Sequence, residues 1–326
     1  MLKTLAAAAL CTILAMSGAS AQSATNYPAQ PITIVVPFSA GGPTDTVTRL
    51  VAQSMSKDLG QQVLVQNVGG AGGTLGAGQV ADATADGYTL LLHHIGMSTA
   101  PTLYRSLAFD PLKDFTPIGL VTSVPMTLVA RKDFEPTTMA ELVDYLKTKG
   151  TDTTYANAGI GSASHLCGML LQNALGVKMI TVPYQGAAPA MTDIMGGQVD
   201  LLCDQTTNTT NQIKGGEVKA YAVTTPERLA SLPDLPTTKE SNLPALNVSV
   251  WHGLYGPAGL DPAIVAKLQA SLAKALKDET VKARFAELGT APATEAEATP
   301  DALRQTLTSQ IELWRPIIQA AGEYAD

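Results

Sequence analysis

The chain has 326 residues, of which 45% are hydrophobic and 15% charged, and its net charge at pH 7 is −7. This acidic balance argues against a nucleic-acid partner and against binding to anionic membranes, because both need a basic face. A single hydrophobic core rarely serves a chain of this length, so we expect two domains.

Residues 1–21 are predicted to be a signal peptide. Lys3 precedes an apolar run, Leu5–Met16, which is shorter than the roughly 20 residues that a membrane-spanning helix needs. Ala19-Ser20-Ala21 then matches the small-x-small pattern that signal peptidase cuts, so the mature chain is expected to begin near Gln22. The segment therefore predicts export to the periplasm rather than a membrane anchor.

After this segment, short β-branched runs alternate with helical stretches, which is typical of a mostly parallel sheet covered on both faces. The first strands are expected at Ile32–Pro37, Val63–Val68 and Tyr88–His93. A helix is expected at about Asp45–Leu59, and the Gly-rich segment Gly69–Gly78 opens the next one.

The strand and helix pattern starts again near Val124. Further strands are expected at Met126–Arg131, Thr153–Asn157, Met179–Pro183, Val199–Asp204 and Val218–Val223. We interpret residues 125–225 as an inserted domain II, and residues 22–124 and 226–326 as a discontinuous domain I. Two chain crossings between the domains make a hinge, and a hinge implies a cleft.

Beyond a Pro-rich loop, the strand Val248–Tyr255 leads into three amphipathic helices. In the last of them, Thr299 is the expected N-cap and Pro300 the first helical residue. The apolar stripes of the first and last helices are Ile264, Leu268, Leu272 and Leu276, and Leu303, Leu307, Ile311 and Trp314. With no sheet left to build, these helices are expected to pack on the N-terminal half of the chain.

Three loops place small residues between a strand and the start of a helix. Free backbone N–H groups and the helix dipole attract anions there, and ligands of open α/β sheets bind beyond the carboxyl ends of the strands. One such loop is usually only a tight turn, but three from two domains predict a carboxylate site in the cleft. The predicted ligand-binding residues in these loops are Phe38, Ser39, Ala40, Gly41, Gly42, Gly161, Ser162, Tyr184, Gln185, Gly186 and Ala187.

Several longer strings resemble the substrate-binding proteins of tripartite tricarboxylate transporters, the Bug family. The matching strings are ITIVVPFSAGGPTD (32–45), DGYTLLL (86–92), PLKDFTPIGLV (111–121), NAGIGSASHL (157–166), VPYQGAAPAMTDIMGGQVDLL (182–202) and AVTTPERLASLPDLPT (222–237). HHIGMS (93–98) and CDQTTNTT (203–210) further resemble the aspartate-binding subgroup. The resemblance covers nearly the whole chain after residue 21.

The resemblance implies an α/β Venus-flytrap fold of type II, with a central mixed sheet in each domain and a ligand cleft between them. It implies a monomeric periplasmic receptor without cofactors. In this family the ligand carboxylate sits on backbone amides and waters between two loops, here Phe38–Gly42 and Tyr184–Ala187. The partners would be integral-membrane transporter subunits, or alternatively a membrane kinase that senses the ligand. His93–Gly96 and Cys203–Gln205 depart from the common pattern, so an acidic amino acid, a dicarboxylate and an aromatic acid all stay open as ligands.

Charged and titratable residues near the expected cleft carry separate hypotheses. His94 is predicted to line the cleft from the loop 94–99, whereas adjacent His93 should point to the opposite face, so no metal site is predicted. Asp204 should emerge at the cleft edge, where it either meets the amine of an α-amino dicarboxylate or caps a turn. Asp45 is expected to organise the first anion loop. Thr74, in the second Gly-rich segment, is a further predicted contact.

Motif tests argue against an enzyme. GAGQVA (Gly76–Ala81) fits G-x-G-x-x-A but does not directly follow a strand, and there is no G-x-S-x-G or HExxH. Ser162 and His165 lack an orienting acid, and His165 and His252 are expected to be structural. Cys167 and Cys203 either form a disulfide or are two buried thiols, because the sequence leaves the distance between them open.

Overall fold

The computed structural model describes residues 26–322, 324 and 325, so the predicted signal peptide lies outside the described residues. Its strands are β1 (Ile32–Val36), β2 (Val63–Asn67), β3 (Thr89–His94), β4 (Phe115–Arg131), β5 (Thr154–Asn157), β6 (Ile180–Pro183), β7 (Leu201–Gln205), β8 (Val218–Val223) and β9 (Ser249–Pro257). Its α-helices are α1 (Pro43–Leu59), α2 (Thr74–Ala81), α3 (Gly96–Leu103), α4 (Met139–Lys149), α5 (Ala163–Leu175), α6 (Ala187–Met195), α7 (Thr206–Lys214), α8 (Pro262–Lys277), α9 (Glu279–Glu287) and α10 (Pro300–Ala321). In the described part of the chain, no helix is long and apolar enough to span a membrane.

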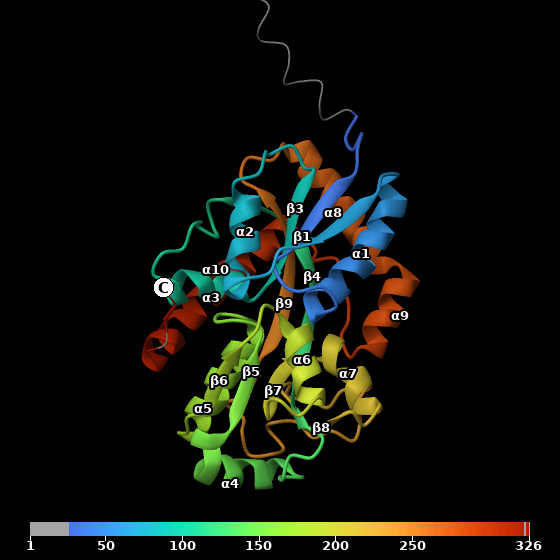
Figure 1. Ribbon diagram of the computed structural model, residues 1–326. Helices are drawn as coiled ribbons and strands as arrows, with labels where there is room; N and C mark the ends of the chain where they lie inside the picture. Colours follow the sequence, from blue (N-terminus) through green and yellow to red (C-terminus); the bar gives the residue numbers. More distant parts are fainter. Residues whose placement is uncertain (1–25, 323, 326) are drawn as a thin grey trace, which may run out of the picture.

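The strands form one continuous mixed sheet in the order β2-β1-β3-β9-β4-β7-β5-β6, with β8 also paired to β4. β1 runs parallel to β2 and β3, and β5 runs parallel to β6 and β7. β9 is antiparallel to both β3 and β4. The predicted α/β fold with mixed sheets is confirmed, and the two sheets are joined through β4 (Figure 1).

β4 belongs to both parts of the sheet. Its first part, Phe115–Pro125, pairs with β9, and its last part, Met126–Arg131, pairs with β7 and β8. We call β1–β3, β9 and the first part of β4 lobe I, and β5–β8 with the last part of β4 lobe II. Figure 1 shows lobe I above and lobe II below, with β4 and β9 running lengthwise between them.

The sequence placed a strand only from Met126 onward, and this expectation was wrong for the first part of β4. Pro117, Gly119 and Pro125 disfavour a regular strand. The structure accommodates them because the pairing of β4 with β9 shifts register between Pro117 and Gly119 and again beyond Leu120.

The predicted domain boundaries remain predictions, but the hydrogen bonds locate the chain crossings. After β8, Thr238 N–H donates to the Val223 carbonyl at 2.9 Å, and Thr224 Oγ1 donates to the Val248 carbonyl at 2.6 Å. The segment between β8 and β9 therefore stays with lobe II. Boundaries drawn from these contacts would fall within β4 and at the start of β9.

The C-terminal helices pack on lobe I, as their apolar stripes predict. The α8 stripe lies in one buried cluster with β1 and α1 residues such as Ile34 and Val51. The α10 stripe lies in a second cluster that includes Leu103 of α3 and Tyr255 of β9. Burying each such side chain contributes about 2 kcal/mol. The N-cap of α10 is Thr299, whose side chain accepts a hydrogen bond from Ala302 N–H at 3.3 Å, which confirms the predicted helix start.

Candidate functional site

A small cavity lies between the lobes, beyond the ends of β1, β3, β5 and β7. It is lined by Phe38, Pro43, Thr44, His94, Ala158, Ser162, Ala163, Ser164, Ala187, Asp204 and Gln205. Its volume is about 10 Å³, close to the room that one water molecule needs. The lining comes from segments far apart in the chain, so the cavity exists only where the lobes meet.

Four helices begin at this cavity. The N-caps are Gly42 for α1, Ser162 for α5, Gly186 for α6 and Gln205 for α7. Each helix start presents free N–H groups and the positive end of a dipole, which together favour an anion. The structure thus brings the three loops singled out in the sequence to one place and adds a fourth, at α7.

The loops of opposite lobes touch directly. Ser39 N–H donates to the Gln185 carbonyl at 3.2 Å. A Cβ on Gly186 would lie 2.1 Å from Ser39 Oγ, and its φ of +156° disfavours other residues. A Cβ on Gly69 would lie 2.9 Å from the Gln185 carbonyl oxygen. These glycines allow the two backbones to approach, so side chains at either position would push the lobes apart.

The Asp45 side chain holds the first loop in place by hydrogen bonds to neighbouring protein groups. Its Oδ2 accepts hydrogen bonds from Gly41 N–H at 2.8 Å and from Arg49 Nε at 2.9 Å, and its Oδ1 accepts one from Asn67 Nδ2 at 2.9 Å. Asn67 Nδ2 also donates to the Phe38 carbonyl at 3.0 Å. Burial acts to raise the pKa of Asp45, but the hydrogen bonds from Arg49, Gly41 and Asn67 together lower it. Asp45 is therefore a fixed negative charge of the framework.

Three buried histidines form the lobe I wall. The ring of His94 stacks on Phe38 with centroids 4.5 Å apart, and the ring of His93 meets Phe38 edge-on at 5.6 Å. The expectation that adjacent His93 would point to the opposite face was wrong. Both residues lie in β3, and their rings meet with centroids 5.0 Å apart. β3 ends at His94 and α3 begins at Gly96, where the sequence predicted a loop.

Hydrogen bonds assign the protons of these histidines. Gly96 N–H donates to His94 Nδ1 at 3.0 Å, so neutral His94 carries its proton on Nε2. His252 Nδ1 donates to the Val250 carbonyl at 3.1 Å, so its Nε2 accepts from Thr44 Oγ1 at 3.3 Å. Burial lowers the pKa of His93 and of His252 to about 3 and that of His94 well below its usual value. The histidine wall is therefore neutral near pH 7.

Asp204 supplies the opposite, lobe II wall. It is 2% exposed, and its Oδ2 accepts a hydrogen bond from Asn208 Nδ2 at 2.7 Å. Burial raises the pKa of Asp204 to about 7, against the smaller effects of hydrogen bonds from Asn208 and the Gln205 backbone. The alternative hypothesis, in which Asp204 caps a turn, stays a prediction: the N-cap of α7 is Gln205, and the Gln205 side chain makes no capping hydrogen bond.

Neighbouring Gln205 was not singled out from the sequence, and neither were Thr44 and Ser164. The Oε1 atom of Gln205 is buried without a hydrogen-bond partner. All three residues lie within two positions of a helix N-cap that follows a strand. That position is the signal by which they could have been found.

Other predicted residues do not line the small cavity. Thr74 Oγ1 donates to the Ala71 carbonyl at 2.9 Å in an exposed position, so Thr74 is not a cavity contact. The Gly161 carbonyl accepts from Thr99 Oγ1 at 3.3 Å. Tyr184 and Gln185 instead line a larger surface hollow of about 630 Å³. Since that hollow is open and none of its described lining residues is charged, we place the candidate site at the small cavity.

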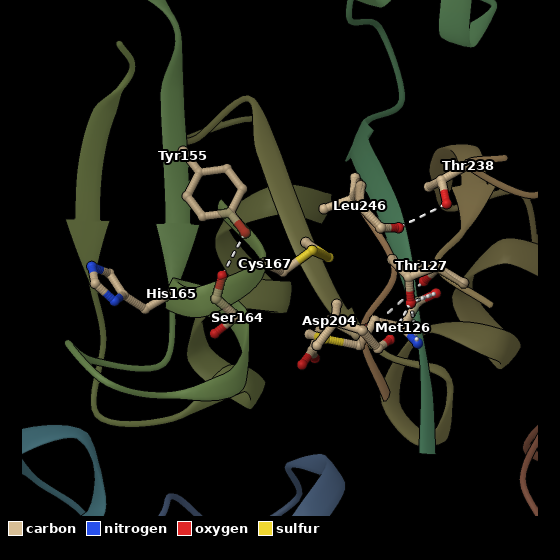
Figure 2. The surroundings of a disulfide bond; sticks show 12 residues. Met126, Thr127, Tyr155, Ser164, His165, Cys167, Asp204, Thr238 and Leu246 are labelled. Carbon is tan, nitrogen blue, oxygen red and sulfur yellow. Dashed lines mark hydrogen bonds between the residues drawn. A yellow bond between two sulfur atoms is a disulfide. The ribbon is translucent and has the colours of Figure 1, made fainter. Parts of the chain in front are cut away.

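A disulfide joins Cys167 of α5 to Cys203 of β7, with Cα atoms 6.1 Å apart (Figure 2). Of the two alternatives that the sequence left open, the structure has the bonded pair. The bond holds β7 against α5 next to Asp204. Elsewhere in the described residues, no group of three or more His, Cys, Asp and Glu is placed to hold a metal ion.

Known proteins resemble this chain in sequence and in fold. Residues 47–323 match the family model described as tripartite tricarboxylate transporter family receptor. An Agrobacterium vitis protein encoded in the TAR-I ttuE-ttuC' intergenic region is 55% identical over 93% of this chain and 88% of its own length. The structure of the periplasmic binding protein BugD is 50% identical, with a TM-score of 0.90, covering 92% of this chain and 100% of that one. MatC from Rhodopseudomonas palustris with bound malate is 40% identical, with a TM-score of 0.87, covering 90% and 100%.

Proposed function

Because the chain belongs to the tripartite tricarboxylate transporter receptor family, we propose that it is a periplasmic receptor for a small carboxylate. Members of this family are solute-binding receptors and not enzymes. The proposed location rests on the predicted signal peptide. The proposed partner, a set of integral-membrane transporter subunits, rests on the family description.

The observation that carries the proposal is the convergence of four helix N-termini on one enclosed cavity. The starts of α1, α5, α6 and α7 supply N–H donors and positive dipole ends from both lobes. His94 adds an N–H donor at Nε2. A carboxylate held between these groups would gain charge-assisted hydrogen bonds from both sides of the cavity at once.

Ligand entry requires the lobes to separate, because the cavity has room for about one water molecule. β4 and β9 are the strands through which lobe I continues into lobe II, so they are the proposed hinge. Contacts such as Ser39 N–H to Gln185 O at 3.2 Å and Tyr104 OH to Ile160 O at 2.7 Å join the lobes. A ligand that binds better when these contacts are made shifts the population to the closed state.

We propose an acidic amino acid or an aliphatic dicarboxylate as the ligand. The malate-bound relative supports a short dicarboxylate. The acceptors Asp204 and Gln205 support an additional amine on the ligand, because both are buried and neither contacts a cation among the lining residues.

A thermal-shift screen tests the proposal. The purified protein, unfolded and refolded to remove any carried ligand, is screened against aspartate, glutamate, malate, succinate, adipate, citrate, terephthalate and nicotinate. A ligand present at a hundred times its dissociation constant stabilises the folded state by about 2.7 kcal/mol. The absence of a thermal shift with every acid of the panel would contradict carboxylate binding.

A matched pair of glycine variants checks the location of the site. Gly186→Ala places a Cβ 2.1 Å from Ser39 Oγ and is expected to abolish the ligand-induced shift. Gly78→Ala, whose added Cβ meets nothing within 4 Å, should keep the full shift. An unchanged shift in Gly186→Ala would place the ligand elsewhere.

A further inference from the structure

Asp204 is a buried acid without a cationic partner. Its carboxyl lines the cavity, and its one side-chain donor is the amide of Asn208, 2.7 Å from Oδ2. No Lys or Arg lines this cavity in the described part of the chain. Figure 2 shows the carboxyl of Asp204 directed away from Tyr155 and Cys167 and toward the blue ribbon of the first hundred residues.

The titratable groups on the lobe II elements packed around Asp204 have hydrogen-bond or ion-pair partners of their own. Tyr155 of β5 has a raised pKa because it is buried, and its hydroxyl donates to the Ser164 carbonyl at 2.6 Å. Arg131 of β4 pairs with Asp200 at 2.8 Å, and Asp193 of α6 accepts from Tyr184 OH at 2.6 Å. His165 of α5 accepts from Gly161 N–H at 3.3 Å, and its ring is turned away from Asp204 (Figure 2).

Across the cavity, the lobe I groups are neutral near pH 7 or already paired. His94 and His252 have pKa values lowered by burial, so both rings are neutral near pH 7. Arg49 of α1 is held by Asp45 at 2.9 Å. The net charge of the cavity lining is therefore the charge of Asp204 alone, and one proton changes it from −1 to zero.

A second uncommitted acceptor lies beside this acid. Gln205 is 2% exposed, lines the same cavity, and its Oε1 has no hydrogen-bond partner. A buried oxygen without a donor costs free energy, and a ligand N–H group would recover it. Asp204 and Gln205 together present acceptors to a ligand, whereas the helix N-termini present donors.

We propose that Asp204 and Gln205 form a specificity subsite in which one proton decides the class of ligand. With Asp204 ionised, the subsite takes the ammonium group of an α-amino dicarboxylate. With Asp204 protonated, it takes a dicarboxylate that lacks an amine, and the proton comes from solvent. This inference rests on the proposed function, because it divides the ligands of the same cavity into two classes.

Electrostatics at close range gives the reason. In a poorly solvated cavity, an ionised carboxylate repels a second anion and attracts an ammonium ion more strongly than it would in water. A doubly charged ligand without an amine therefore raises the pKa of Asp204 on binding, and an ammonium group lowers it. Because the pKa of Asp204 is about 7 before either binds, both protonation states are populated near neutral pH.

Isothermal titration calorimetry with L-aspartate and succinate tests the proposal, because these probes differ only in the α-ammonium group. Each is titrated from pH 6.5 to 8.5 in two buffers of different ionisation enthalpy, which counts the protons exchanged. Succinate should take up close to one proton at pH 8.5 and lose affinity about tenfold per pH unit above 7. Aspartate should release a proton at pH 6.5, and its affinity should level off above pH 7.

Three variants separate the subsite from the rest of the cavity. Asp204→Asn should bind succinate with no proton exchange and a constant affinity, and should bind aspartate about 10- to 100-fold more weakly at pH 8.5. Gln205→Met should weaken aspartate and leave succinate unchanged. The control Asp144→Asn makes the same charge change on the exposed face of α4 and should behave as the wild type.

Several outcomes would overturn the proposal. Equal proton counts for the two probes would do so, as would proton exchange with succinate that persists in Asp204→Asn. If neither probe binds between pH 6.5 and 8.5, the proposed subsite fails. A thermal shift with another carboxylate of the panel would then leave the proposed receptor function standing.

Discussion

Two acids at the candidate site, Asp45 in lobe I and Asp204 in lobe II, have similarly small exposed fractions and opposite pKa shifts. Their exposed fractions are 3% and 2%, and each lies within three residues of the N-cap of a helix. Asp45 has a lowered pKa, whereas the pKa of Asp204 is raised to about 7. Burial alone therefore does not decide the charge of a carboxyl.

Two differences separate these acids: Asp204 lies deeper in the protein, and the donors around each acid differ. Asp45 accepts from a guanidinium, a backbone N–H and an amide, all within 2.9 Å, whereas Asp204 has a single side-chain donor. Hydrogen bonds to the charged form offset desolvation at Asp45 and fail to do so at Asp204. Asp45, whose carboxylate is saturated with hydrogen-bond donors, holds a loop in place. Asp204, whose carboxylate is undersaturated, can change its protonation state when a ligand binds.

The largest expected effect concerns what anchors Asp204. Replacing Cys167 and Cys203 together by Ser removes a crosslink between residues 36 positions apart, which should lower the free energy of unfolding by about 4 kcal/mol. Asp45 in lobe I is not held by a disulfide. Removing the disulfide should therefore loosen the packing of lobe II only. Urea denaturation with and without reductant measures the loss. A loss under 1 kcal/mol would show that packing alone holds β7 on α5.

Removing the saturated acid should destabilise the protein. Asp45→Ala deletes the acceptor of Gly41, Arg49 and Asn67, and we expect a loss of about 3 kcal/mol at pH 7. Since the folded-state pKa of Asp45 is lowered, its contribution is present above the unfolded pKa and disappears as the pH falls through the folded pKa. Urea melts at pH 7 and pH 3 test this, and an equal loss at both values would contradict it.

Neutralising the undersaturated acid should have the opposite sign. The folded-state pKa of Asp204 is raised, so its favourable contribution is present below the unfolded pKa and is lost as the pH rises to about 7. Asp204→Asn should therefore raise the free energy of unfolding by about 2 kcal/mol at pH 8.5, because a neutral amide is less costly to bury than a carboxylate. At pH 5 the gain should be smaller, and it should vanish only below the unfolded pKa of about 3.9. Destabilisation at pH 8.5 would refute the contrast with Asp45.

The smallest effects come from a matched pair of asparagines. Asn67→Ala removes one of three donors from Asp45, and Asn208→Ala removes the side-chain donor of Asp204. Each should cost about 1 kcal/mol. Carbon-13 titration of the carboxyls should show Asp45 still ionised at pH 7, held by Arg49, while the pKa of Asp204 rises further. If Asp45 in Asn67→Ala and Asp204 in Asn208→Ala had similar pKa values, the proposed difference between the two acids would be wrong.

Much of the fold was predictable because its signals are local. The β-branched run 32–36 forms β1, and Thr299 with Pro300 starts α10. The small-residue loops that led to Phe38, Ser162 and Ala187 reach the cavity lining. These features depend on the turn chemistry and periodicity of a few neighbouring residues, and a sequence states both directly.

Other features depended on distant partners. The expected strand began only at Met126, yet β9 and its register shifts hold Pro117 and Pro125 in β4. His93 read as facing away from His94, but the turn into α3 puts both rings against Phe38. Thr74 read as a ligand contact, but its hydroxyl turns back to Ala71. The contacts of β4 with β9 and of both histidines with Phe38 are long-range, whereas the Thr74 bond is local.

The sequence by itself determined the α/β pattern and several helix starts, and from those starts it predicted a carboxylate ligand. Only the tertiary structure decided which helix starts meet, that Cys167 bonds to Cys203, and that Asp45 is saturated with donors while Asp204 is not. The physical reason is range. Capping, periodicity and dipoles act within a few residues, whereas desolvation and hydrogen-bond saturation depend on groups that the fold brings from elsewhere in the chain.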